Sequence, residues 1–239
     1  MGGVSRRQAL AGFGSVSLAA LLAACSDDDD SPAEPATART DAQKSEPPPS
    51  SAGELASRFD DAARCTRTAE ETAGPFYFEV DRVRSDIREG RNGAPLRLGV
   101  RVRDLGNDCK PISNAVVDVW HCDATGSYSE PGETYLRGLQ VTNGDGIVEF
   151  TTIYPAWYPG RTVHIHAKVH LDKRTVLTTQ FYFADDFTDR VFSLEPYASD
   201  TGRDAFNDSD PLYERDLELS LSKEGGAYLG LITLDVASA

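Results

Sequence analysis

The sequence predicts an all-β fold, a β-sandwich of mostly antiparallel strands with long loops that we expect to carry the functional site. Short apolar, alternating or β-branched segments recur after residue 95, and turn residues separate them. Helical patterns are few, and no repeat of fixed period is present. The strands are expected at residues 96–103, 115–120, 146–153, 163–171, 175–183 and 227–236.

Each strand rests on its own pattern. Residues 96–103 alternate apolar and polar side chains, whereas residues 115–120 are apolar and β-branched, which indicates a buried strand. Residues 146–153 follow a turn of Asn and Gly residues. The next two strands are expected to form a hairpin across residues 172–174, and residues 184–215 to form a long excursion with short helical turns.

The first quarter of the chain is expected to lie outside this fold. Residues 1–24 resemble a signal peptide, with a twin-arginine pattern at Ser5–Leu10, a short apolar run and a lipobox that ends at Cys25. Residues 25–60 are rich in Asp, Pro and Ser and are expected to be a disordered tether, although residues 53–63 can hold one short helix. The folded domain is expected at residues 61–239. The sequence thus predicts an exported protein with a lipid anchor at Cys25.

The charge of the chain excludes some partners. The formal net charge is −14, and no basic stripe is present. Nucleic acid and anionic membrane surfaces are therefore not expected partners. Membrane contact is expected only through the lipid at Cys25, and a homo-oligomer stays open.

The four cysteines predict one disulfide bond. With Cys25 assigned to the anchor, three cysteines remain for an oxidising compartment. Cys109 and Cys122 flank one extended strand, so they are expected to lie too far apart to pair. Cys65 is therefore expected to pair with one of the two, and we favour Cys109.

The most informative stretch is Thr151–His166, which contains two of the four histidines. Residues 163–169 read as a strand, on which side chains two apart project to the same face. His164 and His166 can therefore reach one metal ion. Two histidines spaced in this way are as often surface residues as metal ligands. Here, however, Tyr154, Tyr158 and Arg161 lie just upstream, which favours a site.

The neighbouring residue types indicate which metal. Two histidines can serve zinc, copper or iron, and the stretch offers no Cys pair, HExxH motif or carboxylate run. A phenol titrates near 10, so a strong Lewis acid is needed to ionise it at neutral pH. Ferric iron is the physiological candidate.

A second stretch supports this interpretation and leads to a family. Residues 114–129 begin as a buried strand, break at Ala124–Ser127 and continue into Tyr128. The pattern of residues 117–129, followed by that of residues 152–166, resembles the intradiol ring-cleavage dioxygenases. The similarity is greatest to the exported branch related to protocatechuate 3,4-dioxygenase and catechol 1,2-dioxygenase. Residues 71–77 and 177–183 resemble further segments of that family, and the resemblance spans about residues 65–235 in order.

The resemblance implies one non-haem Fe(III) and a catechol-type substrate. The implied ligands are Tyr128, Tyr158, His164 and His166, with Tyr158 preferred to Tyr154 because it matches the family pattern. The implied reaction inserts O2 between the two hydroxyl-bearing ring carbons and gives a cis,cis-muconate-type diacid. Tyr128 is also counted as catalytic, because one tyrosinate would accept a proton as the diol binds.

Other residues receive supporting roles. The permanent charge of Arg161 would stabilise carbanion character on the ring, and the resemblance assigns the Gln180 amide to orienting the substrate or oxygen atoms. A flat aromatic substrate needs aromatic and apolar walls. The candidate walls are Gly74, Pro75, Phe76, Tyr77 and Trp157.

Three aromatic residues near the site are weighed separately. Tyr154 is expected to be a packed aromatic residue of the loop, Trp120 is expected in the core, and His121 is left undecided. Two other functions remain open: a surface-anchored binding module without catalysis, and a hydrolase that uses the His pair with zinc. No single residue decides which catechol derivative is used.

Overall fold

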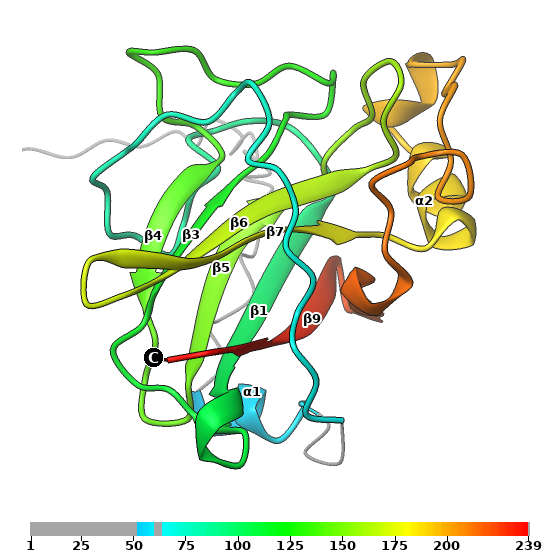
Figure 1. Ribbon diagram of the computed structural model, residues 1–239. Helices are drawn as coiled ribbons and strands as arrows, with labels where there is room; N and C mark the ends of the chain where they lie inside the picture. The colour runs from blue at the N-terminus through cyan, green and yellow to red at the C-terminus, as the bar shows by residue number, and fades with distance from the viewer. Residues whose placement is uncertain (1–51, 60–63, 239) are drawn as a thin grey trace, which may run out of the picture. The chain divides into compact units, whose positions relative to one another are not determined.

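The computed structural model describes residues 52–59 and 64–238 (Figure 1), and the regular secondary structure of this part of the chain is mostly two β-sheets. The expected signal peptide, the anchor at Cys25 and most of the expected tether lie outside the described residues. Within residues 52–59 and 64–238, no helix combines the length and the apolar composition that a membrane span requires. The predicted all-β sandwich is confirmed.

The first sheet is built on the long strand β1. Its order is β2-β1-β9-β8, and β5 pairs with β1 on the edge that β2 also uses. All pairs are antiparallel except β1 with β9, where Leu96 lies beside Tyr228 in a parallel register. The bounds are β1 Pro95–Asp104, β2 Lys110–Pro111, β5 Ile147–Ile153, β8 Ser220–Glu224 and β9 Ala227–Val236.

The second sheet carries the histidine pair and has the order β4-β3-β6-β7, with every pair antiparallel. Asp172 and Lys173 join β6 to β7 with φ angles of 46° and 64°. Two residues with positive φ form the hairpin turn that matches strand twist, so the predicted hairpin is confirmed. The bounds are β3 Val116–Trp120, β4 Arg137–Val141, β6 His164–Leu171 and β7 Arg174–Tyr182.

The core lies between the two sheets because each contributes one apolar face. Val117, Val119 and Ile165 project inward and are fully buried among residues of β1, β5 and β9. By strand alternation, Asp118 and His166 then project from the opposite face of the second sheet. This opposite face, which we call the outer face, carries the candidate site.

Residues 64–87 cross that outer face, and we call them the crossing segment (Figure 1). The Glu71 amide donates to the Thr178 carbonyl of β7 at 2.8 Å, and the Arg84 amide donates to the Leu139 carbonyl of β4 at 3.0 Å. The Ile87 amide then donates to the Thr151 carbonyl of β5. The segment therefore spans the second sheet from edge to edge and reaches the first sheet.

A disulfide bond anchors the start of the crossing segment. Cys65 pairs with Cys109, with Cα atoms 5.8 Å apart, and Cys122 is a buried free thiol. The favoured pairing is thus confirmed. The amide nitrogen of Thr66 adds a hydrogen bond to Asp235 Oδ2 on β9 at 3.0 Å.

Helices occupy little of the described chain. Helix α1 (Ala52–Ala56) precedes the sheets, and Leu55 and Phe59 are buried against Leu229 and Leu231 of β9. Residues 52–59, assigned from sequence to the tether, therefore belong to the packed structure. Helix α2 (Asp185–Phe192) and the 3₁₀ turns Tyr197–Ser199 and Arg215–Leu217 lie in and just after the predicted excursion; Leu105–Asn107 is a third such turn.

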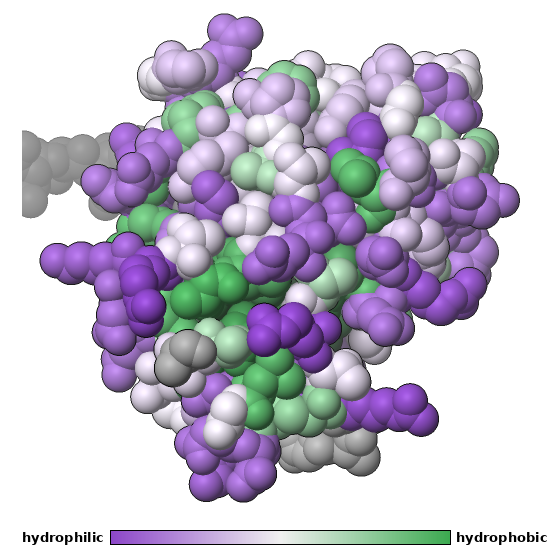
Figure 2. Space-filling view, viewed as in Figure 1, coloured by the Kyte–Doolittle hydropathy of each residue, from purple (hydrophilic) through white to green (hydrophobic). Residues whose placement is uncertain are grey.

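Most of the surface in the view of Figure 2 is hydrophilic, in keeping with the net charge of −14. Apolar residues form a band in the middle of this face, and polar residues frame it. The large apolar side chains exposed over the described chain are few and scattered: Phe76, Val83, Val141, Leu194 and Phe206.

Candidate functional site

Four side chains converge on the outer face of the second sheet. His164 and His166 of β6 place their Nε2 atoms 3.1 Å apart. The Tyr158 hydroxyl lies 3.2 Å from His164 Nε2, and the Tyr128 ring centroid lies 6.1 Å from that of His166. The structure therefore brings together all four residues that the sequence assigns to a metal.

Both imidazoles are held in their neutral form. His164 Nδ1 lies 2.6 Å from the Thr162 carbonyl oxygen, so Nδ1 carries the proton and Nε2 keeps its lone pair. Burial, and then the charge of Arg161, lowers the pKa of His164 to about 3. Burial and the neighbouring His164 hold the pKa of His166 well below its ordinary value. Neutral imidazole is the form that binds a metal.

The Tyr128 hydroxyl is the strongest sign of a missing partner. Tyr128 is 8% exposed, and its oxygen makes no hydrogen bond of normal geometry within the described chain. Burial raises the pKa of Tyr128 well above its ordinary value, and the nearby Tyr158 hydroxyl adds to the shift. A bound cation would reverse that shift and satisfy the oxygen. Two phenols and two neutral imidazoles therefore fit a ferric ion.

The loop that carries Tyr128 folds around one carboxylate. Asp123 Oδ1 accepts hydrogen bonds from the Thr125 amide at 2.8 Å and the Ser127 amide at 3.1 Å. Gly126 has φ of +78°, and a Cβ atom there would lie 2.4 Å from the Trp157 carbonyl oxygen. Glycine thus lets the Tyr128 loop press against the loop that carries Tyr158.

The second tyrosine loop is held by the excursion after β7. Asp210 Oδ2 accepts from Arg161 Nε at 2.8 Å and from the Thr162 amide at 2.9 Å, and its side chain is fully buried. Asp204 accepts from the Gly160 amide. Sequence reasoning missed Asp210, because its partner Arg161 is 49 residues away and no local pattern marks the pair. The excursion therefore positions Arg161 and Tyr158.

The side chains of Arg161 and Gln180 are hydrogen-bonded to each other. Arg161 Nη2 donates to Gln180 Oε1 at 2.7 Å, and Gln180 Nε2 donates to the Thr72 carbonyl at 3.1 Å. Gln180 lies beside His166 in the β6–β7 register. Both predicted supporting residues thus lie next to the histidine pair and are bonded to each other.

The crossing segment supplies one wall of a cleft beside Tyr128. The Phe76 ring stacks on the Tyr128 ring at 4.5 Å, and a Cβ atom on Gly74 would lie 3.3 Å from the His166 ring. A cavity of about 400 Å³ opens here, lined by residues 75–78 and 126–131. Pro75, Phe76 and Tyr77 line it, whereas Gly74 lies against His166. Trp157 packs against the core and does not line the cavity.

The remaining residues weighed from sequence have structural roles. Tyr154 is fully buried, and its hydroxyl lies 2.8 Å from Thr188 Oγ1. Both ring nitrogens of His121 are satisfied at 2.7 Å, by the Cys122 carbonyl and by Thr152 Oγ1, so His121 is a core residue. Trp120 is buried, and its ring stacks on that of His166 at 5.0 Å.

A buried carboxylate lies under the aromatic wall. Asp118 of β3 accepts a hydrogen bond from the Tyr77 hydroxyl, and Lys168 Nζ sits 3.2 Å from the Tyr77 ring centroid. Burial raises the pKa of Asp118 to about 7, against the opposing effects of Tyr77 and Lys168. Asp118 thus exchanges its proton near neutral pH.

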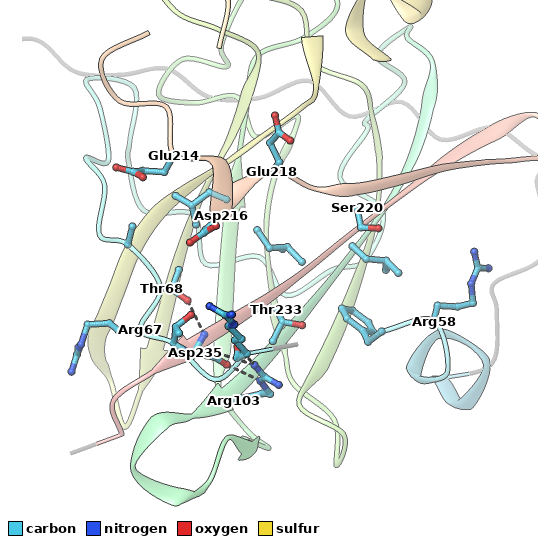
Figure 3. A pocket seen from close by; sticks show the side chains of 17 residues that line it. Arg58, Arg67, Thr68, Arg103, Glu214, Asp216, Glu218, Ser220, Thr233 and Asp235 are labelled. Carbon is cyan, nitrogen blue, oxygen red and sulfur yellow. Dashed lines mark hydrogen bonds and ion pairs between the residues drawn. The ribbon is translucent and has the colours of Figure 1, made fainter. Parts of the chain in front are cut away.

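A larger cavity of about 520 Å³ lies away from this chemistry (Figure 3). Arg103 and Asp235 face each other in it, with Arg103 Nε 2.7 Å from Asp235 Oδ1. Cys65, Cys109 and Asp235 gather nearby, but both sulfur atoms belong to the disulfide bond. None of the predicted site residues lines this cavity.

Comparison with known proteins gives a consistent result. A family model described as Dioxygenase (Dioxygenase_C) matches residues 73–200, more than half of the chain. Chlorocatechol 1,2-dioxygenase of Rhodococcus opacus is 30% identical over 149 residues, 50% of this chain and 57% of that protein. Catechol 1,2-dioxygenase 1 of Acinetobacter lwoffii is 31% identical over 142 residues, 47% of this chain and 45% of that protein. The chain thus spans about half the length of the curated relatives it matches.

Among solved structures, an intradiol ring-cleavage dioxygenase from Tetranychus urticae superposes with a TM-score of 0.67 at 30% identity. The match covers 73% of this chain and 96% of that one. The similarity therefore extends over nearly the whole of a known folded unit.

We predict that Gly126→Ala lowers stability and disturbs the site. The new methyl group would collide with the Trp157 carbonyl and separate the two tyrosine loops, so a loss of about 2 kcal/mol or more is expected. Gly132→Ala is the matched control, since φ is also positive there but no atom lies within 4 Å of the added group. Thermal unfolding of both variants measures the difference. Equal losses would mean that the loops are not in contact at Gly126.

We predict that the stability of the Asp118→Asn variant, relative to that of the wild type, increases as the pH rises. Between about pH 4 and pH 7 the unfolded chain releases this proton while the folded protein keeps it, so the wild type loses stability across that window. The Asn variant lacks this loss, which amounts to a few kcal/mol at most at about 1.4 kcal/mol per pKa unit. Urea unfolding of both proteins from about pH 4 to pH 8 measures the contribution of the Asp118 proton to the free energy of unfolding. A stability difference that does not change with pH would contradict the assignment.

Proposed function

Because the chain belongs to the intradiol ring-cleavage dioxygenase family, we propose that it is a non-haem iron enzyme that cleaves a catechol between its two hydroxyl-bearing carbons with O2. The expected product is a cis,cis-muconate-type diacid. One observation carries the proposal: the buried Tyr128 hydroxyl makes no hydrogen bond of normal geometry to the described residues, and it lies beside two imidazole nitrogens and a second phenol.

The iron would be held by Tyr128, Tyr158, His164 and His166. When bound, ferric iron supplies a Lewis acid that takes up the diol oxygens and draws electron density from the ring. Two phenolates and neutral imidazoles offset two of its three positive charges, which favours the oxidised metal. Thr162 sets the proton on His164 Nδ1 and so keeps Nε2 available.

Two tyrosines and one arginine of the chain would handle the protons and the negative charge of the reaction. Once bound iron had ionised them, the phenolate oxygens of Tyr128 and Tyr158 would be the groups placed to accept protons as a diol binds, since no carboxylate of the described residues lies among the converging atoms. Arg161 keeps its charge at every working pH and stabilises negative charge on the ring. Asp210 and Gln180 fix its guanidinium from two sides, so the charge does not have to reorient during the reaction.

The cleft orients the ring and limits water. Phe76 and Tyr77 of the crossing segment give flat faces, and residues 126–131 complete the lining of the cleft. The Thr72 carbonyl ties the crossing segment to Gln180. A binding module or a zinc hydrolase would give no reason for the orphaned buried phenol, so neither alternative is preferred.

We also propose that the protein is exported and lipid-anchored at Cys25, with residues 1–24 as its signal. The Cys65–Cys109 disulfide bond supports an oxidising compartment. Mass spectrometry of the mature protein is expected to show a chain that begins at an acylated Cys25. An unmodified N-terminus at Met1 would contradict this proposal.

The visible spectrum of the purified protein tests the iron proposal. We expect about one iron per chain and a red to brown colour from tyrosinate bound to ferric iron, with a band that shifts when a catechol is added under nitrogen. Tyr158→Phe and Tyr128→Phe should weaken or shift the band. Tyr154→Phe is the matched control, because that hydroxyl bonds to Thr188 and faces no ligand. A protein that stays colourless after ferric reconstitution would refute the site.

A further inference from the structure

The four converging ligands recognise a diol but leave the rest of the substrate undefined. Catechols differ in the substituents on the ring, and these must lie against the cleft beside Tyr128. Resting on the proposed function, we propose that this site selects catechols whose substituent carries no negative charge and discriminates against carboxylated catechols. The charges around the cleft carry this inference.

The cleft itself offers no cation to a carboxylate. Its lining residues, 75–78 and 126–131, are mainly aromatic, apolar or hydroxyl-bearing, and the single charged residue among them is Glu130. Glu130 is exposed at the cleft. The Phe76 ring is 42% exposed and lies 4.5 Å from Tyr128, with the Tyr158 ring 6.0 Å away, edge on. A substituent would therefore meet an aromatic ring and a carboxylate.

Arg161 already has an anionic partner and does not line the cleft. Its Nε atom lies 2.8 Å from the fully buried carboxylate of Asp210, and its Nη2 atom donates to Gln180. A further acid, Glu71, lies close enough to interact with both members of this pair and with Glu214. Burial, and then repulsion by Glu214 and Asp210, raises the pKa of Glu71, although the charge of Arg161 opposes the rise. Carboxylates thus outnumber the one guanidinium on this side of the site.

A second guanidinium lies behind the cleft wall and serves a structural purpose. Arg137 is 2% exposed; its Nε atom donates to Ser129 Oγ at 2.6 Å, and its Nη2 atom donates to the Phe76 carbonyl at 2.8 Å and the Ser129 carbonyl at 3.0 Å. It therefore ties the two walls together and does not line the cavity. Its Nη1 atom has no hydrogen-bond partner in the described part of the chain. If carboxylated catechols are accepted after all, Arg137 is the group that would bind the carboxylate of the substrate.

The physical cost of a charged substituent follows from this arrangement. A carboxylate loses water on entering an aromatic cleft and is repelled by Glu130 at its edge and, at longer range, by Glu71, and the residues that line the cleft supply no cation to compensate. An uncharged group of the same shape avoids both penalties. Selection of this kind comes from repulsion of the wrong substrate as well as attraction of the right one.

A matched pair of substrates tests the inference on the iron-loaded full-length protein. In 3,4-dihydroxybenzoate and 3,4-dihydroxybenzamide the ring and the shape are shared and only the charge differs. We expect kcat/KM to be at least tenfold higher for the amide, with a smaller ratio at high salt because the rim charges are screened. Anaerobic titration of the visible band should show the same order in Kd.

Variants identify the groups responsible. Glu130→Gln and Glu71→Gln should each narrow the amide-to-acid ratio several-fold. Asp172→Asn is the matched control: it removes the same charge from the exposed β6–β7 turn, at the opposite end of β6 from His164, and should leave the ratio unchanged. Equal or faster cleavage of the acid would overturn this inference alone. A protein that binds no iron would overturn the proposed function, and the inference with it.

Discussion

The alternation of side chains along β6 is the constraint on which the site depends. It places His164 and His166 on the outer face of the second sheet, with Nε2 atoms 3.1 Å apart, while Ile165 and Ala167 are buried in the core. The same strand therefore stabilises the sandwich with one face and places the two proposed metal ligands on the other. A shift of one residue in its register would exchange the two faces and lose both functions.

The loops around β6 are held by contacts that are distant in sequence. Asp210 fixes Arg161 and the start of β6, Gly126 lets the two tyrosine loops meet, and Arg137 joins the loop after Tyr128 to the crossing segment. Each contact uses a buried polar group or a backbone atom, so it tolerates little displacement. The tyrosines are thus positioned by structure outside their own loops.

The electrostatic character of the site comes from burial and from a local excess of acids. Burial keeps both imidazoles neutral and raises the pKa of the Tyr128 and Tyr158 phenols above the ordinary value. Both shifts suit a cation site, because neutral imidazoles can bind a metal directly and a bound metal would reverse the shift of the phenols. Asp210 pairs with Arg161 and, together with Gln180, holds its guanidinium in place next to the histidine pair.

The sequence by itself determined the features that local periodicity and spacing encode. The strand with two histidines, the hairpin at Asp172 and Lys173, and the family pattern around Tyr128 and Tyr158 were all visible from residues close together in the chain. Strands β4 and β8 were missed because Arg137–Val141 and Ser220–Glu224 are short and partly polar. Only the tertiary structure decided that Cys65 pairs with Cys109, that Asp210 holds Arg161 and that Phe59 packs on the first sheet. Those contacts join residues that chain folding brings together, and no local pattern records which distant partner a side chain will meet.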